Sequence, residues 1–292
     1  MNRFLLPVSV LMLVALASSS VADNHLSYWY RNYNNEASRD LLTLVLEKTE
    51  DFYGPITVSK SPQITQGRAV AELGDGHKSL VSLINVVVDE EREKSMIPVK
   101  IPTDGGLIGL RVCIIRKDER ERFQDIRSHL DIREKGITFG QGLHWPDAQI
   151  LQENDFPVVT SARYEGLFDM LREKRFNCFL RGANEAIEDL KSYGNDELMI
   201  EPDLLFAYPS ASFFFVSQGD SELAARLELG LRRAILDGSY EAYFRHHYQP
   251  AIDELKLDQR RIIRLNNPLL SDQTLLNAAE KLRLGDGKLP IY

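Results

Sequence analysis

Short apolar runs rich in β-branched residues alternate along this chain with amphipathic segments of helical periodicity, and no other feature constrains its fold as strongly. Residues 80–88 and 107–115 are nearly unbroken apolar runs, which is typical of strands buried on both faces. Residues 37–50 place Leu41 and Val45 four positions apart, as one face of a helix requires. Strands that alternate with helices predict a layered α/β architecture.

The same patterns predict the remaining elements. Further strands are expected at residues 27–31, 56–59, 137–140, 158–159, 176–180 and 213–216, and further helices at residues 66–73, 146–153, 164–174, 223–235 and 239–248. Residues 89–94 are charged and are expected to form a surface loop or turn, whereas the tail from Gln249 onward gives no clear prediction. The length of 292 residues favours two domains, and no repeat or linker separates them.

The composition excludes several classes of protein. Hydrophobic residues make up 43% of the chain and charged residues 27%, as in ordinary globular proteins, so a disordered or low-complexity chain is excluded. The formal net charge of −8 argues against a nucleic-acid partner, which would require an excess of Lys and Arg.

The first 22 residues have the character of an export signal. Arg3 supplies a positive charge, residues 4–17 form an uncharged apolar run, and residues 20–22 offer small residues for cleavage before Asp23. The apolar run is shorter than the roughly 20 residues that a membrane-spanning helix needs. We therefore expect a soluble periplasmic protein without membrane insertion.

The two cysteines, Cys113 and Cys178, each fall in an apolar strand. Buried thiols are the default expectation for such positions, and a periplasmic disulfide is the alternative. Two cysteines exclude a disulfide scaffold, and the six histidines show no zinc-ligand spacing. No metal or cofactor is expected.

Five segments carry, in order and spacing, a resemblance to a known family: residues 62–76, 89–94, 136–142, 164–180 and 229–248. The chain resembles the type II periplasmic solute-binding proteins, specifically the family 3 proteins that bind amino acids for ABC importers. The resemblance implies two α/β lobes that hold a ligand in the cleft between them.

The resemblance also implies how the chain divides between the lobes. Residues 1–22 would be the signal peptide, residues 23–116 and 207–292 would form lobe 1, and residues 117–206 would form lobe 2. The chain would cross between the lobes near residues 116–117 and again near residues 206–208.

Arg92 is the first candidate for ligand binding. It falls where family members place an Arg on the ligand carboxylate, and a guanidinium offers that group two parallel charge-assisted hydrogen bonds. Read from the residues alone, Arg92 is a solvated loop charge paired with Glu90 or Glu91.

Residues 140–147 form a second candidate site. Glycines lead there into a helix with Pro146 in its first turn, an arrangement that directs unpaired backbone N–H groups toward the cleft. His144 and Trp145 are the candidate ligand contacts in this segment. An ordinary strand-to-helix turn, with Trp145 as a packing residue, is the alternative.

Aromatic residues supply further candidates. Alternation along the first predicted strand puts Tyr28 and Tyr30 on one face, where the resemblance implies a ring that stacks on the ligand. Packing in the core is the alternative. Arg68 and Tyr164 are additional cleft candidates.

The sequence departs from the amino-acid-binding pattern at two places. Residues 86–88 are valines where small hydroxyl residues usually precede the Arg, and Arg181 and Gly182 stand where the family usually offers an Asp to the ligand ammonium. With Arg92 and Arg181 both at the cleft, an anionic ligand is favoured unless Glu185 takes over the ammonium.

These features predict a monomeric periplasmic binding protein that captures a small polar, anionic or amino-acid-like metabolite. Its partner would be an ABC permease or, alternatively, a membrane receptor that senses the ligand. Glu165 near His144 leaves a dehydratase or hydrolase on the same fold as a further alternative. No nucleophile elbow or phosphate-binding loop is present, so a non-enzymatic role is expected.

Overall fold

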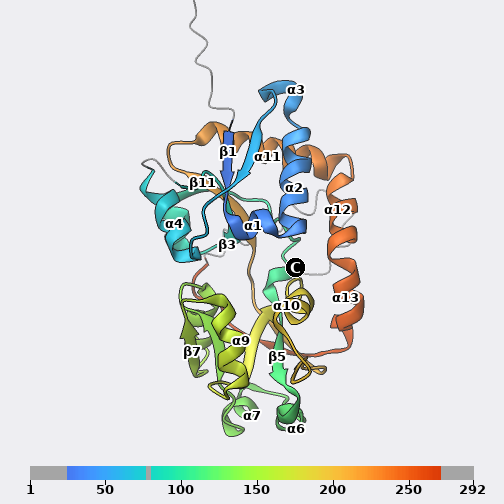
Figure 1. Cartoon of the computed structure of the whole chain (residues 1–292). Helices are drawn as coiled ribbons and strands as arrows, with labels where there is room; N and C mark the ends of the chain where they lie inside the picture. Colours follow the sequence, from blue (N-terminus) through green and yellow to red (C-terminus); the bar gives the residue numbers. More distant parts are fainter. Residues whose placement is uncertain (1–24, 77–79, 271–292) are drawn as a thin grey trace, which may run out of the picture.

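The computed structural model describes residues 25–76 and 80–270 of the chain. The expected signal peptide, residues 1–22, lies outside the described residues, as does the final part of the tail, residues 271–292. Strands and helices gather into an upper and a lower lobe, and no sheet is shared between them (Figure 1). The predicted two-lobed α/β fold is confirmed.

Lobe 1 contains two small sheets. The first pairs two parallel strands, β1 (His25–Tyr28) and β2 (Thr57–Lys60). The second places β11 (Ser212–Ser217) antiparallel between β3 (Ile84–Val87) and β4 (Met96–Val99). The helices of this lobe are α1 (Tyr30–Asn34), α2 (Glu36–Glu47), α3 (Glu50–Tyr53), α4 (Gln66–Asp75), α5 (Glu90–Ser95), α11 (Ser221–Leu236) and α12 (Ser239–His247).

Lobe 2 is built on one seven-stranded sheet. Its strands lie in the order β12 (Arg261–Arg264), β10 (Leu204–Ala207), β5 (Leu110–Arg116), β8 (Cys178–Gly182), β6 (Phe139–Gly142) and β7 (Val158–Ser161), while β9 (Leu198–Ile200) pairs with β5. Its helices are α6 (Arg120–Phe123), α7 (His129–Glu134), α8 (Pro146–Glu153), α9 (Tyr164–Arg172) and α10 (Ala186–Tyr193). Three short 3-10 helices, η1 (Leu107–Gly109), η2 (Lys117–Glu119) and η3 (Leu257–Gln259), complete the described elements together with α13 (Gln249–Leu255).

Local sequence explains the main helix pair of lobe 1. Asn35 caps α2 by accepting a hydrogen bond from the backbone N–H of Ser38, and Leu41 and Val45 form its buried face. Helix α11 packs directly on this face, because Gly230 has no side chain and a β-carbon there would lie only 2.3 Å from the Val45 carbonyl oxygen. The predicted helices at 37–50 and 223–235 therefore form one packed layer.

The charged segment 89–94 is helical, which corrects the expectation of a loop or turn. Asp89 accepts a hydrogen bond from the backbone N–H of Arg92 and thereby caps α5. The strand β4 that follows was not predicted, because Pro98 interrupts its apolar pattern.

The first crossing between the lobes lies earlier than predicted. Strand β5, which runs to Arg116, belongs entirely to the sheet of lobe 2, so the chain crosses before Leu110. At the crossing the two hinge segments touch: Tyr208 N–H donates to the Gly109 carbonyl, and a β-carbon at Gly109 would lie 2.6 Å from the Tyr208 carbonyl oxygen. The apolar run 107–115 fits a buried strand of either lobe, and the division implied by the resemblance assigned it to lobe 1.

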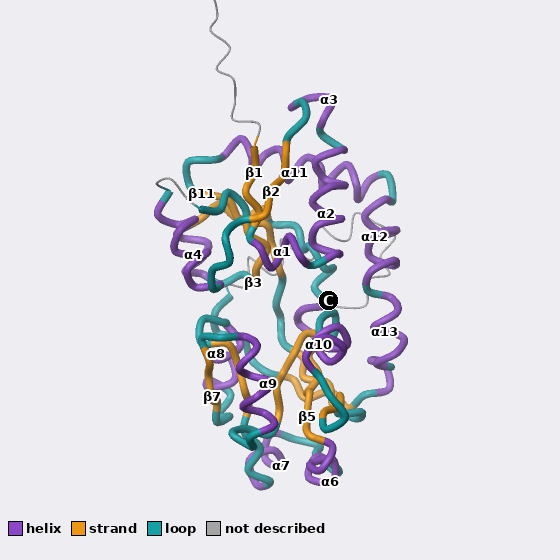
Figure 2. Tube along the Cα trace, viewed as in Figure 1, coloured by secondary structure: helices purple, strands orange, loops and turns teal. Residues whose placement is uncertain are grey.

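The tail beyond Gln249 does not remain with lobe 1, as the predicted division implied. Strand β12 pairs in parallel with β10 at the edge of the lobe 2 sheet, after which Leu269 accepts a hydrogen bond from Glu90 N–H and Leu270 is buried against lobe 1. We call residues 249–270 the C-terminal strap, because they run from lobe 1 to lobe 2 and back. Figure 2 shows helix α13 on the strap, alongside the gap between the lobes.

The default expectation of two buried thiols is wrong. Cys113 on β5 and Cys178 on β8 form a disulfide in the core of lobe 2. Antiparallel pairing of β5 with β8 brings these residues to diagonal positions on one face of the sheet. The sequence around each cysteine does not predict this pairing.

Candidate functional site

The facing edges of the two lobes form the candidate site. Helix α1 of lobe 1 contacts the first turn of α9 of lobe 2, and helices α4 and α5 contact the turn before α8. Figure 1 shows α1 and α4 on the side of lobe 1 that faces α9. Three contacts, described next, join these edges.

Arg92 is buried at the lobe boundary, with 6% of its surface exposed. Its Nη1 donates to the Val87 carbonyl within lobe 1, and its Nη2 donates across the boundary to the His144 carbonyl at 3.0 Å. Asp89 Oδ2 lies 3.1 Å from its Nε, so the ion-pair partner is the helix-capping residue of α5 and neither of the glutamates weighed from the sequence. Burial lowers the pKa of the Arg92 guanidinium, and the Asp89 carboxylate opposes that effect.

His144 makes the second contact. Its backbone carbonyl accepts the hydrogen bond from Arg92. Its imidazole packs against α4 at Gly67, where a β-carbon would lie 2.6 Å from the ring. The strand-to-helix turn before α8 therefore contacts lobe 1 through both backbone and side chain. The sequence predicted a cleft position for His144, and the structure places it between the lobes.

Arg31 and Glu165 make the third contact, an ion pair of 2.7 Å between α1 and α9. The Arg31 guanidinium also lies over the ring of Tyr164, 4.4 Å from its centroid. Sequence reasoning missed Arg31, although its position directly after the aromatic run at the first strand was a usable signal.

Arg181 occupies the lobe 2 side of the boundary and is nearly fully buried. Its Nε donates to Asp189 at 2.5 Å, and its Nη2 lies 3.1 Å from Glu185 Oε2. Burial alone lowers the pKa of this guanidinium, but the two carboxylates outweigh burial and hold it well above its usual value. Trp145 and Tyr164 cover it, with ring centroids 4.7 and 5.3 Å from its carbon Cζ.

A second buried guanidinium, Arg111, lies beside the hinge. Its Nη2 is 2.7 Å from Asp147 Oδ1, its Nη1 is 3.9 Å from Glu185 Oε2, and it lies over the ring of Tyr208. Tyr208 donates its hydroxyl to Asp147. The sequence analysis identified neither Asp147 nor Arg111 as a site residue; the charge of Arg111 within an apolar strand was the available signal.

Asp104 completes this hinge-side cluster from the first crossing segment. Its carboxylate accepts the backbone N–H groups of Gly106 and Ile108 and lies 3.4 Å from Asn184 Nδ2 of lobe 2. Burial raises its pKa to about 6, although the two backbone donors oppose that shift.

Two candidates from the sequence lie away from these contacts. Tyr28 is fully buried in the core of lobe 1, with its hydroxyl hydrogen-bonded to Ser38, because β1 ends at Tyr28 and alternation does not extend to Tyr30. Arg68 is largely exposed on α4 and pairs with Glu72 along the helix. Tyr30, in contrast, lies beside Arg31 at the boundary.

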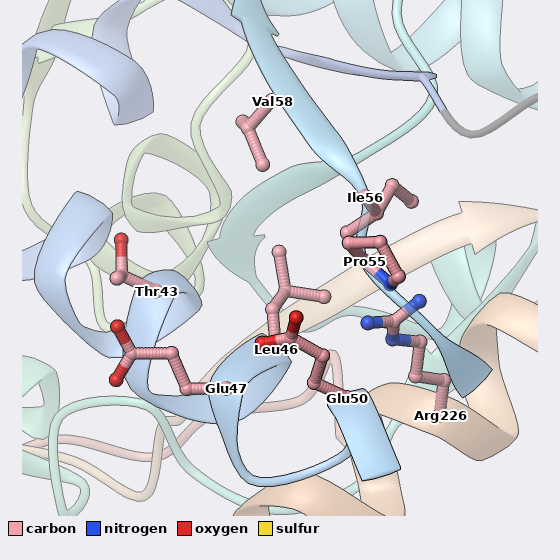
Figure 3. A pocket seen from close by; sticks show the side chains of 8 residues that line it. All are labelled: Thr43, Leu46, Glu47, Glu50, Pro55, Ile56, Val58 and Arg226. Carbon is pink, nitrogen blue, oxygen red and sulfur yellow. The ribbon is translucent and has the colours of Figure 1, made fainter. Parts of the chain in front are cut away.

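A separate pocket of about 230 Å³ lies on lobe 1, between α2, α3, β2 and α11 (Figure 3). Its lining residues are Thr43, Leu46, Glu47, Glu50, Pro55, Ile56, Val58 and Arg226. Arg226 is buried there and donates to Thr49 and to the Gly54 carbonyl, so it fastens the α2–α3 turn to α11. None of the boundary residues lines this pocket.

Within residues 25–76 and 80–270, no helix is long and apolar enough to cross a membrane. The same part of the chain contains no group of three or more His, Cys, Asp or Glu side chains arranged to hold a metal ion.

No family model matches the sequence, and a search of curated proteins finds no match. Solved structures do match. An ancestral arginine-binding protein bound to arginine is 16% identical with a TM-score of 0.57, and the alignment covers 77% of this chain and 98% of that one. An arginine-specific periplasmic binding protein of Salmonella typhimurium is 14% identical with a TM-score of 0.55, covering 77% and 99%.

A histidine kinase sensor domain similar to periplasmic binding proteins also matches, at 16% identity and a TM-score of 0.57, covering 77% of this chain and 97% of that one. The chain therefore has a type II solute-binding fold that resembles amino-acid-binding periplasmic proteins of the family 3 type. About a quarter of this chain lies outside each of these alignments, more than the expected signal peptide accounts for.

Proposed function

We propose that this protein captures a small polar metabolite in the periplasm by closing its two lobes, and that it delivers the metabolite to an ABC importer. The observation that carries this proposal is the set of contacts across the lobe boundary, from Arg92 to the His144 carbonyl and from Arg31 to Glu165. Such contacts exist only when the lobes are together, so they define a closed state that a ligand can stabilise.

The strength of these contacts suits a ligand-controlled closure. The Arg31–Glu165 pair is solvent-exposed, and exposed ion pairs contribute about 0 to 1 kcal/mol. A single hydrogen bond from a charged group adds about 1.5 to 3 kcal/mol. A ligand determines the equilibrium between the open and closed forms if its binding free energies to the two forms differ by more than this sum.

Thermal denaturation in the presence of a library of polar metabolites tests the proposal. A ligand present at 100 times its dissociation constant is expected to add about 2.7 kcal/mol to the free energy of unfolding. If organic acids, amino acids and amines all leave the melting temperature unchanged, the protein is not a solute-binding protein for such metabolites.

A sensing role is the second candidate, and the likeness to a histidine kinase sensor domain favours it. Import and sensing would use the same cleft, since the fold does not determine the role. Neighbouring genes for a permease and an ATPase would support import. A neighbouring gene for a membrane receptor, without those two, would support sensing.

Binding without chemical turnover is part of the proposal. Glu165, the residue that the sequence allowed as a general base, is exposed and paired with Arg31. Incubation of the protein with its bound ligand, followed by NMR for several hours, should show an unchanged ligand. Conversion of the ligand would instead establish a dehydratase or hydrolase.

A further inference from the structure

The pocket on lobe 1 contains a buried arginine that lacks an ion-pair partner. Arg226 is 6% exposed, and its Nε and Nη2 donate to Thr49 and to the Gly54 carbonyl. Among the described residues, no carboxylate lies within ion-pair distance of this guanidinium, and its Nη1 makes no hydrogen bond. Burial lowers the pKa of Arg226, and the charges of Tyr53 and Glu50 do not fully offset that effect. A buried cation of this kind favours an anion beside it.

The wall of the pocket is largely apolar. Leu46, Ile56 and Val58 line it together with Pro55 (Figure 3). The volume of about 230 Å³ is smaller than the roughly 300 to 1,000 Å³ that is typical of sites for drug-sized molecules. The pocket therefore suits a small molecule with an apolar body.

Two carboxylates lie at the rim of the pocket. Glu47 and Glu50 are exposed lining residues, and within the described part of the chain neither takes part in an ion pair. Figure 3 shows that Glu50 and Arg226 reach the pocket from different helices, α3 and α11. The pocket thus separates a buried cation from exposed anions, with apolar surface between them.

We propose that this pocket is a second binding site, separate from the cleft, for a small zwitterion with an aliphatic chain. The carboxylate of the ligand accepts a hydrogen bond from Arg226 Nη1, and its ammonium lies at the Glu50 carboxylate. Its aliphatic chain contacts Leu46 and Ile56 and is thereby removed from water. The site does not depend on the proposed solute-binding function, because none of the residues at the lobe boundary lines the pocket.

The hydrogen bonds of Arg226 within lobe 1 do not account for these features. Its bonds to Thr49 and Gly54 fasten the turn between α2 and α3 to α11, and they use only two of its three nitrogen atoms. That role requires neither an unused Nη1 nor an open volume beside it.

Three probes with related carbon skeletons test the proposal by isothermal titration at neutral pH. They are L-leucine, 4-methylpentanoate, which lacks the ammonium, and 3-methylbutylamine, which lacks the carboxylate. We expect L-leucine to bind more tightly than either analogue. Hydrogen–deuterium exchange locates the binding, since L-leucine should slow exchange in residues 43–58, which include most of the lining residues.

Two variants of lining residues and one control assign the binding to the pocket. Arg226→Met removes the buried cation and should weaken L-leucine binding about tenfold or more. Glu50→Gln removes only an exposed charge and should weaken it about threefold. Glu222→Gln is the matched control and should leave binding unchanged, because this exposed glutamate lies on the same helix as Arg226 but does not line the pocket. If melting curves show that Arg226→Met fails to fold, Glu50→Gln decides.

The outcomes separate this pocket from the cleft. Slowed exchange in residues 86–96 and 140–147 alone, with binding that neither variant weakens, would overturn the second site while supporting the solute-binding function. Binding of either analogue to the pocket as tightly as L-leucine would overturn the zwitterion site, and so would the failure of L-leucine to bind at millimolar concentration. The wider metabolite library decides the solute-binding function independently of these results.

Discussion

The α-carbon of Gly67 faces the imidazole of His144 across the lobe boundary, and a β-carbon on Gly67 would lie 2.6 Å from the ring carbon Cδ2. Gly67 lies in the first turn of α4, in lobe 1, and His144 precedes α8, in lobe 2. Contact this close exists only while the lobes are together, so a side chain at Gly67 would require the exposed His144 ring to shift before the lobes could close.

Gly67→Ala should therefore oppose closure, because the His144 ring must move away from the added methyl group before the lobes can come together. Because the backbone of Gly67 is helical, alanine fits lobe 1 itself and the clash falls only on the partner lobe. Small-angle scattering should show a larger radius of gyration for the variant than for the wild type. The double variant with His144→Ala should return to the wild-type value, and an unchanged radius in the single variant would contradict the importance of this contact.

Arg92→Ala should destabilise the protein even without ligand. The variant loses charge-assisted hydrogen bonds to two backbone carbonyls in a buried setting, at a cost of about 1.5 to 3 kcal/mol for each bond. Urea denaturation measures this free energy of unfolding. Arg68→Ala is the matched control, because its exposed pair with Glu72 should contribute less than about 1 kcal/mol; equal effects of both variants would argue against the buried role of Arg92.

Asp104 should make stability depend on pH near the acidic side of neutrality. Burial raises its pKa from 3.8 to about 6 in the folded chain, so the folded state binds this proton more tightly than the unfolded state. The resulting stabilisation is complete below the unfolded pKa and is lost as the pH rises through the folded pKa, with an amplitude of roughly 3 kcal/mol. Asp104→Asn cannot titrate, so the difference in unfolding free energy between the wild type and this variant should vary over that window and be flat outside it. A difference that is constant from pH 4 to pH 8 would rule this out.

The disulfide should contribute substantially to stability. Cys113 and Cys178 are 65 residues apart, and closing a loop of that length restricts the unfolded chain by about 4 kcal/mol. The double variant Cys113→Ala and Cys178→Ala should unfold at a correspondingly lower urea concentration. Reduction of the wild type should reproduce the loss, whereas the same reductant should have no effect on the double variant.

Local sequence patterns predicted most of the elements because those patterns act over short distances. Helix α8 begins and ends where the proline and the apolar spacing predict, and the Leu-rich periodicity located α11 to within two residues at each end. The predictions were wrong where the assignment of a segment to a lobe depended on its pairing with distant parts of the chain. The apolar run 107–115 fits a buried strand in either lobe, and only pairing with β8 and β10 assigns it to lobe 2.

In the candidate site, too, local patterns predicted some residues, whereas their partners depend on contacts between distant parts of the chain. Four of the residues predicted for the cleft, Trp145, Tyr164, Arg181 and Glu185, lie close together, because each lies at the end of a strand or at the start of a helix in lobe 2. Their partners were not predictable in this way. The pairing of Arg181 with Asp189, and of Arg111 with Asp147, depends on how α10 and α8 pack against the sheet, which no local pattern encodes.

The C-terminal strap sets a geometric limit on how far the molecule can open. Asn266 is held to lobe 2 by a pair of hydrogen bonds with Asn154, and Leu269 is held to lobe 1 through Glu90. The two anchors are three positions apart in the sequence, and a fully extended chain of that length spans about 10 Å. Along this edge the lobes cannot separate by more than that distance unless one anchor detaches. The length of the C-terminal strap between its two anchors therefore limits the amplitude of opening, as the hinge does.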